Sequence, residues 1–341
     1  MREARCSTRS VSDSFLHAEL QRGVALCTKR TSPVSYLLSS LSDMLSIWRV
    51  QVLSIQVITA SKFHSDGNDF MVVAPAQVQE EHYVALTQAI CEDHFGVGAD
   101  GCVFVGEISG EQVSMRIFNR DGGEAGMSGN GFRCGSAFLH HHGLVDQTEL
   151  TLKTASGIKG YTLLEQKEGS WTYRSRMGLP AFEPTAIPFR APDEVQDVRG
   201  FSLDVGGEQV SIAALSVGNP QCVVFGEQLP REEDFQRLGR GLEGHSDFPE
   251  RTNVSFVQVV GPSQLQIRLW ERGVGPTHSS GTGSCGAAVA AIRAGKVQSP
   301  VEVTTETGTQ QVEWDGQTEI LLTGNTRFVA EVHFHWEQQD G

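Results

Sequence analysis

The stretch that decides the fold occurs twice, as Ser128-Gly129-Asn130-Gly131 and, 152 residues later (280 − 128), as Ser280-Gly281-Thr282-Gly283. Each copy leads into a run of small residues. The segments before them match at the same offset, since Arg116-Ile117-Phe118 corresponds to Arg268-Leu269-Trp270. One offset shared by several landmarks indicates a duplicated domain. Two equivalent loops can then face each other across a pseudo-two-fold axis and approach both sides of one bound carbon, which is the geometry that inversion of a stereocentre requires.

The spacing of apolar residues predicts a mixed α and β chain from about Gln56 onward. In the first half we expect helices over 80–91 and 131–142 and strands over 57–63, 70–74, 102–105 and 113–118. In the second half we expect one helix over 284–294 and strands over 210–217, 222–225, 254–260, 265–270, 301–305, 311–314, 319–323 and 326–334. The prolines between positions 180 and 192 mark a looser connection between the halves.

Both glycine-rich stretches stand at the start of a predicted helix. Glycine lets the backbone approach a ligand closely, and the free N–H groups of a helix N-terminus favour an anion. Two converging helix starts would hold one carboxylate and stabilise the negative charge that develops when its α-proton leaves. The alternative is that Gly129, Gly131, Gly281 and Gly283 only permit tight packing. The presence of two copies in register favours the anion site.

Three other patterns do not support a cofactor or a metal. The stretch 96–101 matches G-x-G-x-x-G but precedes a strand, and the stretch 281–286 lies too far from the strand before it for a dinucleotide-binding turn. In His140-His141-His142, consecutive helical residues point about 100° apart and do not converge on one ion. We therefore expect no cofactor and no metal.

Charge and cysteine content limit the partners. The formal net charge of −14 argues against nucleic acid or an anionic membrane as a partner. Seven cysteines without regular spacing fit a reducing compartment, so we expect a cytoplasmic protein. The sequence has no apolar run long enough to span a membrane.

A series of segments, in order along the chain, resembles the signatures of the diaminopimelate epimerases. They are Phe63–Phe70, His94–Gly101, Arg116–Gly122, Gly218–Pro220, Phe248–Val254 and Trp270–Gly275. The resemblance implies an α+β fold of two pseudosymmetric domains of diaminopimelate-epimerase type, each with strands wrapped around a central helix. We place the domains at 56–174 and 175–325, with a final strand and tail, 326–341, that returns to the first domain.

The resemblance also implies a function and a pocket. The function is cofactor-independent inversion of an amino-acid α-carbon, from LL- to meso-diaminopimelate in the lysine and peptidoglycan pathway, commonly by a homodimer. The implied substrate-binding residues are Asn68, Asn119, Asn219, Asn253, Glu271 and Arg272, with Gly129, Asn130, Gly281 and Thr282 holding the carboxylate of the reacting centre.

The sequence departs from the family at the positions that carry the chemistry. Where the family has two catalytic cysteines this chain has Ser128 and Ser280, and the supporting histidine is Gln221, so that only the acidic partner Glu271 remains. A thiol can be tuned to ionise near neutral pH, whereas a serine hydroxyl needs an adjacent base, which a neutral amide cannot be. Losing two tuned bases should slow α-proton abstraction by several orders of magnitude.

Other groups are considered as replacement bases. Cys134 and Cys285 lie more than one turn into their helices and are expected to pack as small buried residues, and His278 is either a substitute base or a solvated loop residue. Three functions stay open: an epimerase with weakened chemistry, a catalytically silent homologue that binds an amino acid or a partner subunit, and a related isomerase or dehydratase that needs one base. We favour the first.

Residues 1–55 are rich in Ser and Arg and fall outside the resemblance. We expect a disordered extension, which a start codon assigned too far upstream would explain; the alternative is an organellar transit peptide. A version that begins near Ile55 should therefore melt within about 1–2 °C of the full chain. The measurement is a pair of thermal unfolding curves, and a large loss of stability would show that the segment packs on the core.

Overall fold

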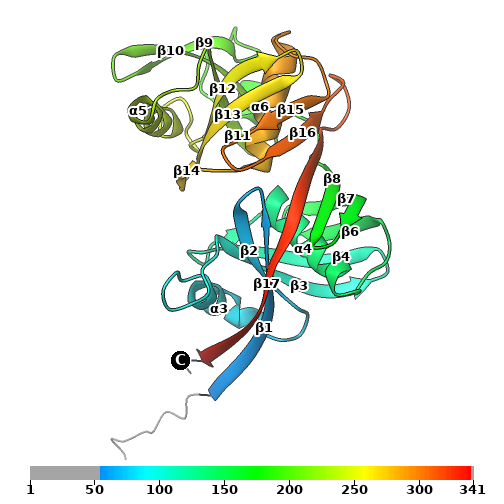
Figure 1. Cartoon of the computed structure of the whole chain (residues 1–341). Coiled ribbons are helices and arrows are strands. Elements are labelled where there is room, and N and C mark those ends of the chain that lie inside the picture. Colours follow the sequence, from blue (N-terminus) through cyan, green and yellow to red (C-terminus); the bar gives the residue numbers. More distant parts are fainter. Residues whose placement is uncertain (1–53, 127, 339–341) are drawn as a thin grey trace, which may run out of the picture. The chain divides into compact units, whose positions relative to one another are not determined.

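The computed structural model describes residues 54–126 and 128–338 (Figure 1). The expectation for residues 1–55 thus lies outside the described residues, apart from the last two. Within the described residues, no helix is both long and apolar enough to cross a membrane. The described chain is an α+β protein, as the sequence predicts, and its two halves repeat one order of elements.

The first half contains two α-helices, the first preceded by a short 3-10 turn. These are α3 (Tyr83–Ile90), which follows η1 (Glu80–His82), and α4 (Gly129–His141). Its strands are β1 (Ser54–Ser65), β2 (Asn68–Val73), β3 (Gly101–Ser109), β4 (Gln112–Asn119), β5 (Glu124–Ala125), β6 (Glu149–Thr154), β7 (Gly157–Lys167) and β8 (Ser170–Arg176).

The second half begins after a connection that holds only the short η2 (Pro184–Ala186). Its helices are α5 (Glu232–Glu243) and α6 (Gly281–Arg293). Its strands are β9 (Arg199–Val205), β10 (Glu208–Ser216), β11 (Pro220–Gly226), β12 (Asn253–Gly261), β13 (Gln264–Glu271), β14 (Gly275–Thr277), β15 (Val301–Thr304), β16 (Thr309–Glu313) and β17 (Leu321–Gln338).

The strand pairings repeat as well. In the first half β2 is parallel to β3 and β4 is parallel to β6, with α3 and α4 in the two crossover connections. In the second half β11 is parallel to β12 and β13 is parallel to β15, with α5 and α6 in the crossovers. The long β17 pairs with β16, β8 and β1, so it belongs to the sheets of both halves. These pairings give each half its own strand layer around one helix.

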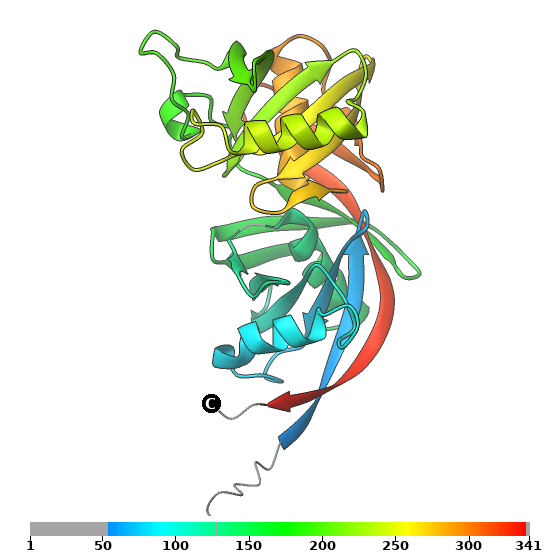
Figure 2. The same ribbon diagram turned by 90° about the vertical axis from the view of Figure 1, so that its left-hand side faces the viewer.

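The central helices are buried along most of their length. Residues 129–139 of α4, which include Phe132, Arg133 and Phe138, and residues 281–291 of α6 are all buried. The outer helices α3 and α5 instead cover the outer face of their sheets, as Figure 2 shows in cyan and yellow-green. Each half therefore has two hydrophobic clusters, one around the central helix and one beneath the outer helix.

Some elements differ from the sequence expectation. The two strands expected over 319–323 and 326–334 form the single strand β17, because Gly324 continues the ladder opposite Tyr173 of β8. Helix α5 was not predicted, although it is amphipathic. The strands β6–β9 were not predicted either, although apolar and polar residues alternate in β6, β8 and β9.

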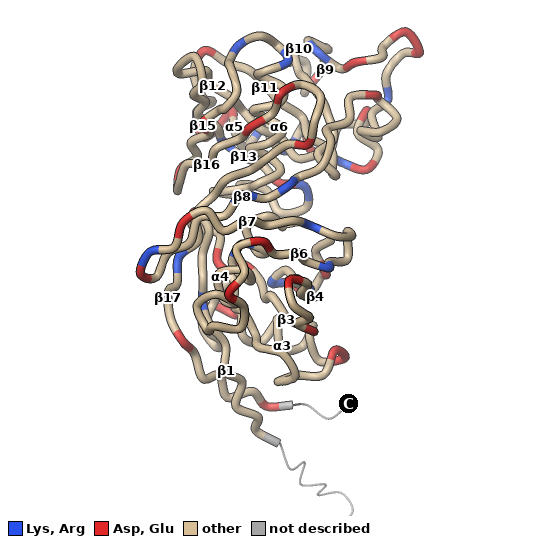
Figure 3. The backbone as a smooth tube through the Cα atoms, turned by 90° about the vertical axis from the view of Figure 1, so that its right-hand side faces the viewer, with Lys and Arg blue, Asp and Glu red and all other residues tan. Residues whose placement is uncertain are grey.

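Two arginines form the same contacts in the two halves. Arg116 on β4 bonds to Glu80 at 2.8 Å, just before α3, and its guanidinium lies over the Tyr83 ring. At the equivalent place on β13, Arg268 bonds to Glu232 at 2.6 Å, at the start of α5, and its guanidinium lies over the Phe235 ring. Basic and acidic positions are interspersed along the described backbone (Figure 3), so such local pairs form readily. The repeated Arg residues thus fix the outer helices to the sheets.

The second glycine of each motif has a packing role. A Cβ on Gly131 would lie 2.8 Å from Ile117 Cδ1, and a Cβ on Gly283 would lie 2.7 Å from Leu269 Cδ2. Both neighbours are buried strand residues at the same offset of 152. At Gly129, by contrast, the nearest atom to such a Cβ is 3.8 Å away. The packing explanation therefore applies to the second glycines and leaves the first glycine of α4 unexplained.

This difference yields a stability prediction. Gly131→Ala and Gly283→Ala should each destabilise the fold by about 1–3 kcal/mol, because a methyl group enters a filled core. Gly129→Ala should leave the free energy of unfolding within about 0.5 kcal/mol. Urea unfolding of the three variants measures this. Equal losses at all three positions would contradict the division of roles.

Candidate active site

The two serines cap the two central helices. Ser128 Oγ accepts a hydrogen bond from the Gly131 N–H at 3.1 Å, and Ser280 Oγ accepts one from the Gly283 N–H at 3.3 Å. An N-cap of this kind satisfies one of the free N–H groups of a first helical turn. The remaining N–H groups of each start stay available to an acceptor.

The two helix starts approach each other. A Cβ on Gly281 would lie 3.8 Å from Gly129 Cα, and Leu322 of β17 packs beside both glycines. Asn130 links the halves further, since its Nδ2 bonds to Asn68 Oδ1 at 3.1 Å and to Ser279 Oγ at 3.3 Å. The two helices therefore meet at their first residues, Gly129 and Gly281, and the predicted residues Asn68 and Asn130 also gather there. Ser279 was not anticipated, because it lies just outside the repeated motif.

A buried arginine lies behind this junction and was missed by sequence reasoning. Arg133 is fully buried in α4; its Nε donates to Ser65 Oγ at 3.1 Å and its Nη2 to Asn130 Oδ1. Within the described part of the chain, its Nη1 has no hydrogen-bond partner, and it lies 3.8 Å from the place of a Cβ on Gly129. The signal in the sequence was a charged arginine within a helix that was predicted to be at the centre of its domain. Its charge adds to the positive potential at the start of α4.

The acidic residue Glu271 lies beside Ser280. Burial raises the pKa of Glu271, a hydrogen bond with the Ser280 side chain lowers it in part, and the nearby charge of Asp100 raises it further. A raised pKa brings this carboxyl group closer to the range in which it can exchange protons at neutral pH. Glu271 and Ser280 thus place a carboxyl group and a hydroxyl group side by side on one side of the junction.

The other side carries no equivalent carboxylate at the matching position. Counting back 152 residues from Glu271 gives Asn119, at the end of β4. Asn119 is exposed, and its backbone N–H bonds to Gly123 O at 2.8 Å. Because an amide does not accept a proton near neutral pH, the two faces of the junction differ in chemical capacity.

Gln221 occupies the position of the supporting histidine and is fully buried against α6. Its Nε2 donates to Asn219 Oδ1 at 2.7 Å, and Asn219 Nδ2 lies 3.4 Å from Thr282 Oγ1. Among the described residues, Gln221 Oε1 has no hydrogen-bond partner. The Gln221 side chain therefore orders the loop that carries Asn219, while its Oε1 atom accepts no hydrogen bond from the described residues.

The remaining predicted residues lie on neighbouring loops. Asn253 Nδ2 donates to Pro220 O at 3.3 Å, and Asn253 Oδ1 accepts from the Arg272 N–H at 2.9 Å. The next residue, Gly273, donates its N–H to Glu243 Oε1 at 2.6 Å. The buried Glu243, which sequence reasoning missed, thereby fixes the loop after β13.

The proposed replacement bases differ in their surroundings. Cys134 and Cys285 are fully buried, and burial raises the pKa of both thiols, in the case of Cys285 to about 12. Neither is therefore an accessible thiolate at neutral pH. His278 is exposed and its Nδ1 lies 3.0 Å from Glu306, beside a pocket that Arg268 and Phe235 also line.

The amino-acid sequence is similar to a known family of proteins. The sequence profile described as diaminopimelate epimerase matches residues 60–182 and 213–329. The chain belongs to the diaminopimelate epimerase family. The diaminopimelate epimerase of Desulforudis audaxviator (strain MP104C) is 40% identical over 266 residues, which cover 77% of this chain and 94% of that protein. The diaminopimelate epimerase of Pelotomaculum thermopropionicum is 38% identical over 266 residues, which cover 77% of this chain and 94% of that protein.

Solved structures share the epimerase fold at lower identity. A phenazine biosynthesis protein of the PhzF family from Bacillus anthracis has a TM-score of 0.57 at 18% identity and covers 81% of this chain and 98% of that one. A hydroxyproline epimerase from Agrobacterium vitis, solved with bound trans-4-OH-L-proline, has a TM-score of 0.57 at 15% identity and covers 85% and 94%. The two-domain fold is thus that of the epimerases, and the chain is an epimerase-like isomerase.

The raised pKa of Glu271 predicts that the stability of the protein depends on pH. Because the folded-state pKa of Glu271 is raised, the folded state holds its proton more tightly than the unfolded chain, so stability is lost as pH rises through the folded-state pKa. Glu271→Gln, which carries no charge, should therefore melt on the order of 2 °C higher than the natural chain at pH 8 and at about the same temperature at pH 4.

Thermal unfolding at a series of pH values measures the difference. The matched control is Glu168→Gln on the exposed turn between β7 and β8, for which the difference should stay flat. A difference for Glu271→Gln that shrinks as pH rises would contradict the assignment.

Proposed function

We propose that this chain is a cofactor-independent epimerase of diaminopimelate or a similar amino acid, acting in lysine and cell-wall synthesis with slow proton transfer. The observation that supports the proposal is the meeting of the two helix starts at Gly129 and Gly281. Two sets of free N–H groups beside the buried Arg133 suit one carboxylate. We also propose that the protein acts in the cytoplasm as a homodimer.

In this proposal the substrate carboxylate binds Gly129, Asn130, Gly281 and Thr282. The rest of the amino acid contacts the side chains at the rim, which are Asn68, Asn119, Asn219, Asn253 and Arg272. With its carboxylate on the helix starts, the α-carbon lies between Ser128 and Ser280. Positive potential from both helices and from Arg133 lowers the energy of the enolate-like charge that forms when the α-proton leaves.

Proton transfer then differs between the two faces. On one face Ser280 is hydrogen-bonded to Glu271, whose raised pKa suits it to accept the proton that the hydroxyl relays. On the other face Ser128 accepts from Gly131, and its neighbour by the repeat is the neutral Asn119. We therefore infer that abstraction from the Ser280 face is slow and that delivery from the Ser128 face is slower still.

The test is Cα exchange of diaminopimelate in deuterated water, followed by NMR separately for the LL and meso isomers. The natural chain should show weak exchange at one configuration and little net inversion. Combining Ser128→Cys, Ser280→Cys and Gln221→His should raise exchange and inversion at least 10²-fold, because thiols at helix starts reach a neutral pKa. Either cysteine alone should not restore inversion, since inversion needs a base and an acid on opposite faces.

Ser284→Cys, one turn further into α6, is the matched control and should not change the rate. Vigorous exchange by the natural chain would mean that another residue, with His278 the first to replace, supplies the base. A failure to bind any amino acid would remove the epimerase proposal, and binding without exchange in any variant would support a catalytically silent homologue.

A further inference from the structure

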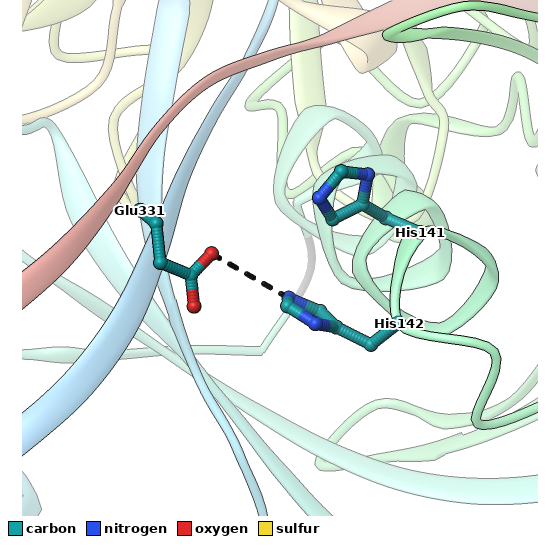
Figure 4. A group of neighbouring side chains, drawn as sticks. All are labelled: His141, His142 and Glu331. Atoms are coloured by element: carbon teal, nitrogen blue, oxygen red, sulfur yellow. Dashed lines mark ion pairs between the residues drawn. The ribbon is translucent and has the colours of Figure 1, made fainter.

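A group of side chains at the far end of α4 has no role in the proposed reaction. His141 and His142 stand at the C-terminal end of this helix and Glu331 on β17 faces them (Figure 4). One donor atom from each of the three lies within 4.8 Å of the others. Since α4 has 13 residues, this group is roughly 20 Å from the helix start at Ser128.

The sequence argument against a histidine site rested on the spacing of about 100° between neighbouring side chains on a helix. His142 is the C-cap of α4, and its N–H still bonds to Phe138 O at 3.0 Å, so the helical backbone extends to this residue. The rings of His141 and His142 nevertheless lie 4.9 Å apart between centroids. Two of the three consecutive histidines therefore converge, and His140 instead bonds to Tyr173 at 2.8 Å.

The surroundings hold these side chains in place. The hydroxyl of the buried Ser61 of β1 donates to Glu331 Oε2 at 3.0 Å, and Ser61 Oγ also lies 2.9 Å from His142 Nε2. The His141 ring stacks on Phe328, with centroids 4.4 Å apart. Three elements, α4, β1 and β17, thus supply an oriented set of nitrogen and oxygen donors.

We propose that His141, His142 and Glu331 bind a Zn²⁺ ion, with water completing its coordination. Two imidazoles and one carboxylate suit zinc among the common divalent ions. Zinc ligands at about 2.0–2.1 Å in a tetrahedron stand roughly 3.3 Å apart. His142 Nε2 and Glu331 Oε2 are already 3.8 Å apart, and both side chains are partly exposed, so small rotations complete the site.

The ion has a structural role in this position. It joins the C-terminal strand β17 to the end of α4, and Ser61 orients the carboxylate from the second shell. A cation there also meets the free carbonyl groups and negative dipole of a helix C-terminus. The site is separate from the proposed epimerase chemistry, and its test does not depend on catalysis.

The experiment titrates tag-free full-length protein, freed of metal with a chelator, with Zn²⁺ by calorimetry and with Co²⁺ by visible absorption. We expect one Zn²⁺ per chain with a micromolar or tighter Kd, an intense Co²⁺ band typical of tetrahedral N/O coordination, and a higher melting temperature with Zn²⁺. His142→Ala and the isosteric Glu331→Gln should each weaken Zn²⁺ binding at least tenfold.

His333→Ala is the matched control, because His333 lies on the same strand and bonds to Thr59 at 3.3 Å outside the group. It should bind Zn²⁺ within twofold of the natural chain. Circular dichroism confirms that each variant is folded, and Glu331→Gln keeps the shape of the side chain if His142→Ala does not fold. Absence of stoichiometric Zn²⁺ at 100-fold excess, or equal affinity in all variants, would overturn the proposal.

Discussion

The approach of Gly129 to Gly281 is the contact on which the site depends. A Cβ on Gly281 would lie 3.8 Å from Gly129 Cα, which is ordinary van der Waals contact, and the second glycines, Gly131 and Gly283, let each helix pack closely on its strand. Under the function proposed above, the free N–H groups of the two helix starts bind one carboxylate at this contact.

Duplication built the two halves alike, and divergence made them chemically unequal. The outer helices are fixed by equivalent arginines, Arg116 and Arg268, so the scaffold kept its symmetry. The polar residues around the junction did not, since Glu271 corresponds to Asn119 and the buried Arg133 corresponds to Cys285. The two halves of the scaffold are therefore alike, whereas a charged side chain stands at the Glu271 position only in the second half and at the Arg133 position only in the first.

The serines at the two family cysteine positions exchange reactivity for helix capping. Ser is among the best N-cap residues, and both serines here bond to the N–H three residues later. A thiol caps poorly but ionises at far lower pH. If the family carries cysteines at these positions, as the resemblance implies, the serines favour helix capping over proton transfer, in line with the general conflict between stability and activity at functional positions.

The sequence by itself determined the duplication, the two central helices and the family, because those rest on glycine spacing and local apolar periodicity. It also predicts that the chemistry departs from the family at Ser128, Ser280 and Gln221. Only the tertiary structure decided that β17 serves both halves, that Arg133 lies behind the helix starts and that His142 turns toward Glu331. These features join residues far apart in the chain through long-range pairing and burial, and no local pattern encodes such contacts.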